Sequence, residues 1–215
     1  MTRPLIITDC DEVLLHMVVP FRQWLDEAHD VHFDMSEPGF TEALRHKDSG
    51  VPLERALVWE LLTGFFDTEM HRQTPIAGAL EALGRLSRVA DIVVLTNITE
   101  RHHQQRIDQL AAHGVHHPVL WNQGGKGRPL AALVAERRPT AAFFIDDLAQ
   151  HHGSVARHAP DVWRLHMIGE PELAVGLPAA PDAHARIDDW AGAEAWIAAR
   201  LDEGPAPLPA GAPQP

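Results

Sequence analysis

Short apolar runs recur along the 215-residue chain, and segments with helical spacing separate most of them. The five clearest runs span residues 4–9, 90–97, 117–122, 140–147 and 161–168. They are mostly continuous rather than alternating, which is typical of strands buried on both faces. Helical spacing connects the later runs, over residues 99–114, 125–139 and 148–160. This alternation predicts an α/β fold, with an open, mostly parallel sheet and helices on both faces.

One interval breaks the alternation. Residues 16–74 contain no strand pattern, but two stretches within them have helical spacing. We therefore predict a small helical cap over residues 16–74, inserted into a core that is formed by residues 1–15 and 75–203. Residues 204–215 are rich in proline, glycine and alanine, a composition that predicts a disordered tail.

Several helix ends carry capping signals. Thr99 is the expected N-cap of the first connecting helix, and Gly114 is the residue expected just after its end. A closing helix is predicted over residues 187–201, with Asp188 or Asp189 as its cap. The side of this helix that we expect to be buried carries Trp190, Ile197 and Leu201.

Composition narrows the possible partners and location. The formal net charge is −12 and no run of Lys or Arg stands out, which argues against nucleic-acid binding through a basic face. No apolar stretch approaches the length of a membrane span, and the first residues lack the apolar region of a signal peptide. Cys10 is the single cysteine, so an internal disulfide is impossible. We therefore expect a cytoplasmic protein that binds neither nucleic acid nor membrane.

The chain contains 15 histidines, including adjacent pairs at 102–103, 116–117 and 151–152. Adjacent side chains diverge on any element, and none of these pairs has the spacing of a helical metal site. We interpret the histidines as scattered surface residues that make the net charge sensitive to pH near neutrality.

Polar side chains follow the apolar runs at the carboxyl ends of the expected strands, where open α/β sheets bind their ligands. They are Asp9 and Asp11 after the first run, Thr96 and Asn97 at the end of the second, Lys126 after the third, and Asp146 and Asp147 at the end of the fourth. Each one alone has an ordinary explanation as a cap, a β residue or a surface charge. Four carboxylates at one sheet edge, however, repel one another unless a cation keeps them ionised. Oxygen ligands suit Mg²⁺, so the set predicts a magnesium site.

The same residues resemble the four motifs of the haloacid dehalogenase (HAD) superfamily. The resemblance lies in the ordered set "IITDCDEV", "VVLTN", Lys126 and "FFIDD", and it spans residues 5 to about 168. The position of the cap, between the first and second motifs, is similar to that in members with a type-one cap. Receiver domains of response regulators use similar residues, but their acidic pair comes early, whereas the "DD" pair of this chain comes last. The resemblance implies a Rossmann-like core.

The resemblance also implies roles for the first two aspartates. Asp9 is expected to attack phosphorus and form an aspartyl phosphate, because a carboxylate is ionised at neutral pH and needs no base. Asp11 is expected to protonate the leaving-group oxygen and then to activate water, and the nearby Asp9 charge favours its protonated form. Alternation along an extended segment turns residues two apart to the same side.

The later motifs complete the implied site. Thr96, with backbone N–H groups near Asn97, is expected to bind a phosphoryl oxygen, while Lys126 offsets negative charge. The expected Mg²⁺ ligands are a side-chain oxygen of Asp9, the backbone carbonyl of Asp11 and a carboxylate oxygen of Asp146, with Asp147 binding directly or through water.

The sequence departs from the family pattern in two places. Glu12 stands where the family most often has glycine, and it adds negative charge near the entrance, where the cap joins the core. Some members carry a second acid shortly after the first aspartate of the fourth motif, but this chain has Gln150, His151 and His152 there. A cysteine-based phosphatase is excluded, because the residue six positions after Cys10 is His16 rather than arginine. We interpret Cys10 as a small buried residue facing away from the site.

Together these observations predict a Mg²⁺-dependent phosphomonoester hydrolase that acts on a small phosphorylated metabolite. A sugar phosphate, a nucleotide and a phosphoglycolate-like acid all fit. A phosphomutase or phosphonatase on the same scaffold is an alternative, and so is a non-catalytic binding or regulatory protein, which Glu12 favours. Haloacid dehalogenation is disfavoured, because that reaction gives Asp11 and Asp146 no purpose.

Overall fold

The computed structural model describes residues 2–35, 37 and 39–207. Its core is a six-stranded sheet in which every neighbouring pair of strands is parallel, in the order β5-β4-β1-β6-β7-β8. The strands are β1 (Leu5–Thr8), β4 (Asp91–Asn97), β5 (Val119–Asn122), β6 (Ala142–Asp146), β7 (Trp163–His166) and β8 (Ala185–Arg186). The predicted parallel α/β sheet is confirmed, and each of the five apolar runs forms a strand. The two-residue β8 is an addition that is too short to leave a sequence pattern.

Helices cover both faces of the sheet, as predicted. Because neighbouring residues of a strand point to opposite faces, Ile6 of β1 packs into one apolar cluster while Leu5 and Ile7 pack into another. The helices that contribute to the cluster of Ile6 are α3 (Ala79–Leu86), α4 (His103–Ala112) and α8 (Trp190–Ala198). Those on the other face are α5 (Gly127–Arg137) and α6 (Ala149–His158).

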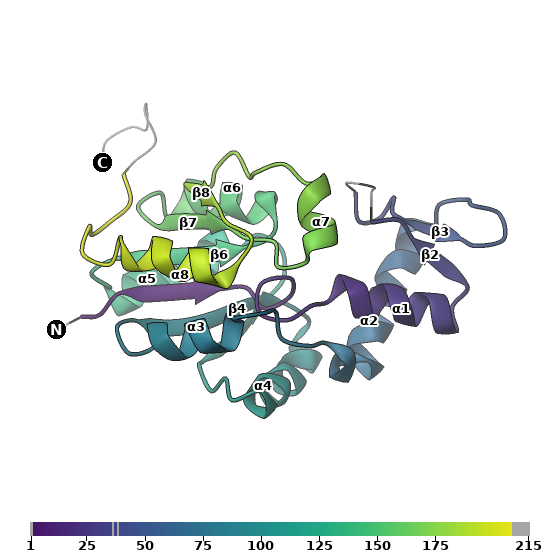
Figure 1. The fold of residues 1–215 in the computed structure, drawn as a ribbon, viewed down its shortest axis with the longest axis horizontal. Helices are drawn as coiled ribbons and strands as arrows, with labels where there is room; N and C mark the ends of the chain where they lie inside the picture. Colours follow the sequence, from purple (N-terminus) through teal and green to yellow (C-terminus); the bar gives the residue numbers. More distant parts are fainter. Residues whose placement is uncertain (1, 36, 38, 208–215) are drawn as a thin grey trace.

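Residues 16–74 form a separate layer, the cap, at the end of the sheet toward which the β1 arrow points in Figure 1. Its elements are α1 (Val18–Ala28), β2 (Val31–Phe33), β3 (Leu44–His46), α2 (Arg55–Thr68) and the short 3-10 helix η1 (Met70–Arg72). The expectation of a strand-free cap is wrong, because β2 and β3 pair as an antiparallel ribbon. Each has only three residues, which is too few for an alternating pattern to stand out.

The cap has its own apolar core, in which Phe21 contacts the rings of Trp24, Phe33 and Phe65. Two chain segments join it to the sheet, and they are hydrogen-bonded to each other. The amide of His16 donates to the carbonyl of Thr74 over 2.9 Å. The cap is therefore joined to the core by two paired segments, around His16 and around Thr74, which together we call the stalk.

The helix ends follow the sequence signals in part. Asp189 caps α8 by accepting a hydrogen bond from the Gly192 amide at 2.8 Å. Gly114 follows α4 with a φ of 80°, a left-handed conformation that glycine adopts without strain. Thr99, in contrast, does not cap backbone amides. Its hydroxyl lies 2.9 Å from Nδ1 of His102, at the end of the short 3-10 helix η2 (Glu100–His102).

Residues 204–207, at the start of the predicted tail, are more ordered than their composition predicts. The carbonyl of Gly204 and the amide of Ala206 are both hydrogen-bonded to the core, and residues 208–215 of the predicted tail lie outside the described residues. Trp190 and Ile197 are buried as expected, whereas Leu201 lies beyond the end of α8 and is only partly buried. Within the described ranges, no helix combines the length and apolar character needed to cross a membrane.

Candidate active site

The sheet brings three of the sequence-predicted residues to one edge. Asp9 directly follows β1, which lies between β4 and β6, and its amide donates to the carbonyl of Ile145 at 2.8 Å. Thr96 lies near the carboxyl end of β4, and Asp146 ends β6. These strands run parallel, so their carboxyl ends meet at the edge of the sheet that faces the cap (Figure 1).

Lys126 joins two of the aspartates. Its Nζ lies 2.6 Å from Oδ2 of Asp9 and 2.7 Å from Oδ2 of Asp146. Lys126 and Asp146 are fully buried, and Asp9 is 6% exposed. The other oxygens accept backbone hydrogen bonds, Asp9 Oδ1 from the Cys10 amide and Asp146 Oδ1 from the Leu148 amide. A buried ammonium is thus matched by two carboxylates whose orientations are fixed.

The pKa values of the four charged groups in and beside this cluster shift in different directions. Burial raises the pKa of Asp9 to about 7, and the charges of Asp146 and Asp11 add to the rise, although Lys126 opposes it. Burial also raises the pKa of Asp147 well above its usual value, helped by the Asp146 and Asp9 charges. For Asp146, burial is outweighed by the Lys126 charge and hydrogen bond, and its pKa is lowered. Burial likewise depresses the pKa of Lys126, but the two carboxylates raise it more, so the ammonium stays charged.

The residues present fit a divalent cation. A carboxylate oxygen of Asp9, one of Asp146 and one of Asp147 all lie within 4.8 Å of one another. The pKa values of Asp9, which is buried, and of Asp147, which is half-buried, are raised by desolvation and by the like charges beside them, and one ammonium cannot satisfy all three carboxyls. A hard cation with oxygen ligands would hold the carboxylates ionised.

Asp11 stands apart from this group. Its Oδ1 accepts hydrogen bonds from Nε2 of Gln73 at 2.7 Å and from Nη2 of Arg106 at 2.8 Å. The same Arg106 nitrogen donates to Oδ2 at 2.9 Å. The side chain of Asp11 is therefore held between the core and the cap, and its backbone carbonyl remains a predicted metal ligand.

Thr96 and Asn97, which are predicted to bind phosphate, are the last two residues of β4. The Thr96 hydroxyl is fully buried and has no hydrogen-bond partner among the described residues. A buried hydroxyl without a partner is costly, so a ligand oxygen at this position would satisfy it. The Asn97 side chain is fixed, since its Nδ2 donates to the Gly124 carbonyl at 2.9 Å and its Oδ1 accepts from Asn122 at 2.8 Å.

Glu12, the departure from the family pattern, connects the core to the cap. Its backbone is left-handed, with a φ of 58°, in the region that glycine adopts most readily. Its Oε1 accepts from the amides of Met17 and Val18 at 2.7 and 2.6 Å, and therefore caps the start of α1. Burial raises the pKa of Glu12 to about 7, although these two amides lower it. Glu12 thus supplies a fixed contact to the first cap helix.

The interpretation of all histidines as surface residues is wrong for His166, for His102 of the first adjacent pair and for both members of the third. His102, His151 and His152 are each no more than 3% exposed. His152 Nε2 lies 3.0 Å from the carbonyl of Asp146, and His151 Nε2 lies 3.2 Å from Nδ2 of Asn97. The rings of His151 and His152 pack beside the site because the first turn of α6 lies against the end of β6. They contact the Asp146 carbonyl and the Asn97 side-chain amide.

Cys10 is buried, as expected, and its Sγ accepts a hydrogen bond from Arg106 Nη1 at 3.2 Å. Burial raises the pKa of this thiol, which keeps it protonated and unreactive. This agrees with its interpretation as a packing residue rather than a nucleophile.

The cap contacts the core on both sides of the site. On one side, Arg22 of α1 pairs with Glu172 at 2.9 Å, on the short helix α7 (Pro171–Gly176) that sequence analysis missed. On the other, Asp67 of α2 lies 2.6 Å from both Arg101 and His102 of η2. These contacts bring the cap over the carboxyl ends of the strands, where it can shield the site from water.

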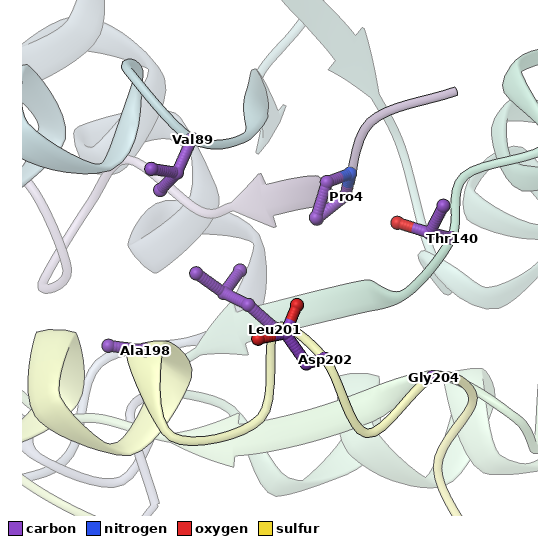
Figure 2. A pocket seen from close by; sticks show the side chains of 7 residues that line it. All are labelled: Pro4, Val89, Thr140, Ala198, Leu201, Asp202 and Gly204. Carbon is purple, nitrogen blue, oxygen red and sulfur yellow. The ribbon is translucent and has the colours of Figure 1, made fainter. Parts of the chain in front are cut away.

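A hollow of about 480 Å³ lies at the opposite end of the sheet (Figure 2). Its lining includes Pro4, which precedes β1, and Thr140, which precedes β6. The lining carries one charged side chain, Asp202, and none of the residues of the carboxylate cluster. This hollow is therefore unrelated to the candidate active site.

Sequence reasoning missed Arg106 and Gln73, the two partners of Asp11. Arg106 had a usable signal, because it precedes Leu110 by four residues and so lies on the buried stripe of its helix. A charge on such a stripe requires a buried partner. Gln73 lies in an irregular segment and had none.

No protein-family model matches the chain, and no curated protein matches its sequence. Solved structures do match. A haloacid dehalogenase-like hydrolase from Streptococcus pneumoniae is 11% identical, with a TM-score of 0.62, over 92% of this chain and 98% of that one. A haloacid dehalogenase-like family hydrolase from Xanthomonas campestris is 16% identical, with a TM-score of 0.58, over 94% and 97% of the two chains. The HAD hydrolase YfnB of Bacillus subtilis, bound to magnesium, is 13% identical, with a TM-score of 0.59, over 92% and 100%.

Other structures with this fold differ in chemistry. They include a phosphoserine phosphatase that carries an analogue of its phospho-aspartyl intermediate, with a TM-score of 0.51 and 13% identity over 88% and 95% of the two chains. They also include the L-2-haloacid dehalogenase PA0810, with a TM-score of 0.55 and 12% identity over 91% and 99%. The reaction therefore has to be argued from the site itself. The chain has the fold of the haloacid dehalogenase-like hydrolases, with a cap inserted after the first strand of its Rossmann-like sheet.

Proposed function

We propose that the chain is a Mg²⁺-dependent phosphomonoester hydrolase of the HAD superfamily, acting on a small phosphorylated metabolite through an aspartyl phosphate. The observation that carries this proposal is the buried cluster in which Lys126 contacts Asp9 and Asp146 while Asp147 completes a set of three carboxylates. Dehalogenation by an aspartate needs neither a metal ion, which three carboxylates would hold, nor a leaving-group acid such as Asp11. The cluster therefore favours phosphoryl transfer.

In the first half of the reaction, an Asp9 carboxylate oxygen forms a bond to phosphorus as the ester P–O bond breaks. The electron pair of that bond goes to the leaving oxygen, which takes a proton from Asp11. Lys126, at 2.6 Å from Asp9, offsets the negative charge gathered around the transferring group. The Thr96 hydroxyl, which has no hydrogen-bond partner in the described part of the chain, would donate to a phosphoryl oxygen.

In the second half, Asp11 accepts a proton from water while the water oxygen bonds to phosphorus. The Asp9–phosphorus bond breaks, which restores the Asp9 carboxylate and releases inorganic phosphate. The contacts of the cap with η2 and α7 would limit the entry of other water during this cycle.

Asp9, Asp146 and Asp147 would hold Mg²⁺, together with the backbone carbonyl of Asp11. The ion, when bound, supplies positive charge that offsets the charge of the phosphoryl group. The chain itself supplies the acidic ligands and holds two of them in place, through Lys126 and the amides of Cys10 and Leu148.

Release of phosphate from 4-nitrophenyl phosphate tests the proposal, measured with Mg²⁺ and with EDTA for the wild type and for Asp9→Asn. We expect turnover that requires Mg²⁺ and that falls below detection in Asp9→Asn. Equal turnover in EDTA, or in Asp9→Asn, would refute the mechanism.

A panel of phosphorylated metabolites separates the alternatives. Interconversion of sugar phosphates without net phosphate release would identify a phosphomutase, and release from phosphonates alone would identify a phosphonatase. Binding of a phosphorylated ligand without turnover across the panel would identify a non-catalytic protein.

A further inference from the structure

Arg106 is a buried cation that the reaction scheme above leaves without a role. It lies on α4 and is fully buried, although it carries a full charge. Its Nη2 donates to both oxygens of Asp11, at 2.8 and 2.9 Å. Its Nη1 donates to Cys10 Sγ at 3.2 Å and to Gln109 Oε1 at 3.0 Å. Burying a guanidinium is costly unless it pairs with an opposite charge. The bidentate contact with the Asp11 carboxylate provides that pairing, and a neutral residue could not make it.

The contacts around Asp11 are asymmetric. Oδ1 accepts from both Arg106 and Gln73, whereas Oδ2 accepts from Arg106 alone among the described residues. Because Oδ1 is bound by two donors, Oδ2 is the oxygen with capacity left to exchange a proton. The carboxyl group also cannot rotate without breaking all three hydrogen bonds.

The same network reaches the cap. Gln73, in the stalk, also lies 3.3 Å from the carbonyl of His16, on the other strand of the stalk. Gln109 donates to the carbonyl of Met70 in η1, and the Arg106 guanidinium lies 5.7 Å from the ring centre of Phe66 on α2. The orientation of Asp11 is thus fixed from the core and from the cap together.

We propose that Arg106 is a positioning residue that holds Asp11 so that Oδ2 exchanges the proton of the leaving group. This proposal rests on the proposed function, because it concerns the step in which the ester P–O bond breaks and its electron pair and the Asp11 proton pass to the leaving oxygen. Rates of such steps fall steeply when the acid is misplaced, so a residue that only holds the acid has a large effect.

A purely structural role for Arg106 makes a different prediction. A buried arginine that serves only packing and charge balance changes the amount of folded enzyme, and so changes the turnover of every substrate by the same factor. A positioning residue for the acid acts selectively, because a 4-nitrophenolate leaves without a proton while an alkoxide does not.

The experiment compares kcat/KM for ethyl phosphate and 4-nitrophenyl phosphate in one enzyme preparation, in the presence of Mg²⁺. The ratio of the two values cancels the fraction of protein that is folded. Arg106→Lys keeps the charge but cannot reproduce the fork of donors, and we expect it to lower the ethyl-to-nitrophenyl ratio by about 10-fold or more. Arg106→Met should lower it at least as much, and Asp11→Asn/Arg106→Lys should show the same ratio as Asp11→Asn alone.

Arg164 provides a matched control. It is also a buried arginine, 3% exposed, but its guanidinium donates to backbone carbonyls next to β7, away from Asp11. Arg164→Lys should leave the ratio unchanged even where it lowers the melting temperature. An unchanged ratio in both Arg106 variants would overturn the proposal.

A crystal structure of Arg106→Lys gives a readout that does not depend on turnover. Rotation of the Asp11 carboxyl away from its place beside Gln73 supports the proposal, and an unmoved carboxyl overturns it. Wild-type protein that hydrolyses neither ester would contradict the proposed function, and this structure would then decide the positioning claim by itself.

Discussion

Replacing Asp9 by asparagine should change how the stability of the metal-free protein depends on pH. The raised pKa of Asp9, about 7 against an ordinary 3.8, means that the folded protein keeps this proton at pH values where the unfolded chain has released it. Stability from this carboxyl is therefore fully present below pH 3.8 and is lost as pH rises toward 7. Asp9→Asn resembles the protonated form and does not undergo this loss.

The rise in pKa sets the size of the effect. At about 1.36 kcal/mol for each pH unit, a rise from 3.8 to about 7 corresponds to at most about 4 kcal/mol. The free energy of unfolding of Asp9→Asn minus that of the wild type should therefore increase between about pH 4 and pH 7, by up to about 4 kcal/mol, and then level off. The increase arises because the wild type must bury a second carboxylate beside Asp146.

Urea unfolding in EDTA at four pH values between 4.5 and 7.5 measures this difference. Asp48→Asn is the control, since it makes the same chemical change on an exposed residue of the cap and should show no comparable trend. Mg²⁺ should narrow the difference at pH 7.5, because the ion binds the wild-type carboxylate; ion at about 100 times its Kd adds about 2.7 kcal/mol to the free energy of unfolding of the wild type. A difference between variant and wild type that stays constant from pH 4.5 to 7.5 would refute the reasoning.

Three further outcomes follow from the site. Lys126→Met should destabilise the metal-free protein by about 3–5 kcal/mol at neutral pH in urea unfolding, because two buried carboxylates lose their common counter-charge; a loss below 1 kcal/mol would contradict this. Glu12→Ala should cost about 1–2 kcal/mol in the same assay, because two amides at the start of α1 lose their acceptor, whereas Glu12→Gln keeps an acceptor oxygen and should cost less. Asp147→Asn should weaken Mg²⁺ binding at least about 10-fold by calorimetry, because the cluster loses one of its three carboxylates, and a nearly unchanged affinity would contradict direct binding by Asp147.

The sheet and the carboxylate cluster were predictable because they depend on patterns that are local in sequence. Continuous apolar runs indicated buried parallel strands, and parallel strands place their carboxyl ends at one edge. Asp9, Thr96 and Asp146 therefore had to lie near one another once the order of strands placed β1 between β4 and β6. The assignment of roles to these residues came from the family resemblance and stays a prediction.

The features that sequence reasoning missed depend on tertiary contacts. The three-residue strands β2 and β3 owe their conformation to pairing with each other and to the cap core, so their own sequences show little. His151 and His152 are polar residues at a helix start, and only the packing of α6 against β6 buries them. Asp11 was expected to point to the same side as Asp9, but no pattern in the sequence indicated that a cation from α4, 95 residues away, holds its side chain.

Glu12 shows how a departure from a family pattern acquires a structural explanation. The sequence placed an acid near the entrance, where the cap joins the core. The structure shows that its carboxylate accepts from the first amides of α1 while its backbone takes a left-handed conformation. Helix capping by a side chain five and six positions earlier has no local signature of the usual kind.

The central claim is that Asp9 receives a phosphoryl group at a site where Asp146 and Asp147 share a cation with it. A crystal structure of the protein with Mg²⁺ and beryllofluoride, which mimics a phosphoryl group on a carboxylate, tests this most directly. We predict that the beryllium atom bonds to an Asp9 carboxylate oxygen, that one fluorine accepts from the Thr96 hydroxyl, and that Mg²⁺ lies among the three aspartates. Beryllofluoride bound elsewhere, or Mg²⁺ outside this cluster, would contradict the account.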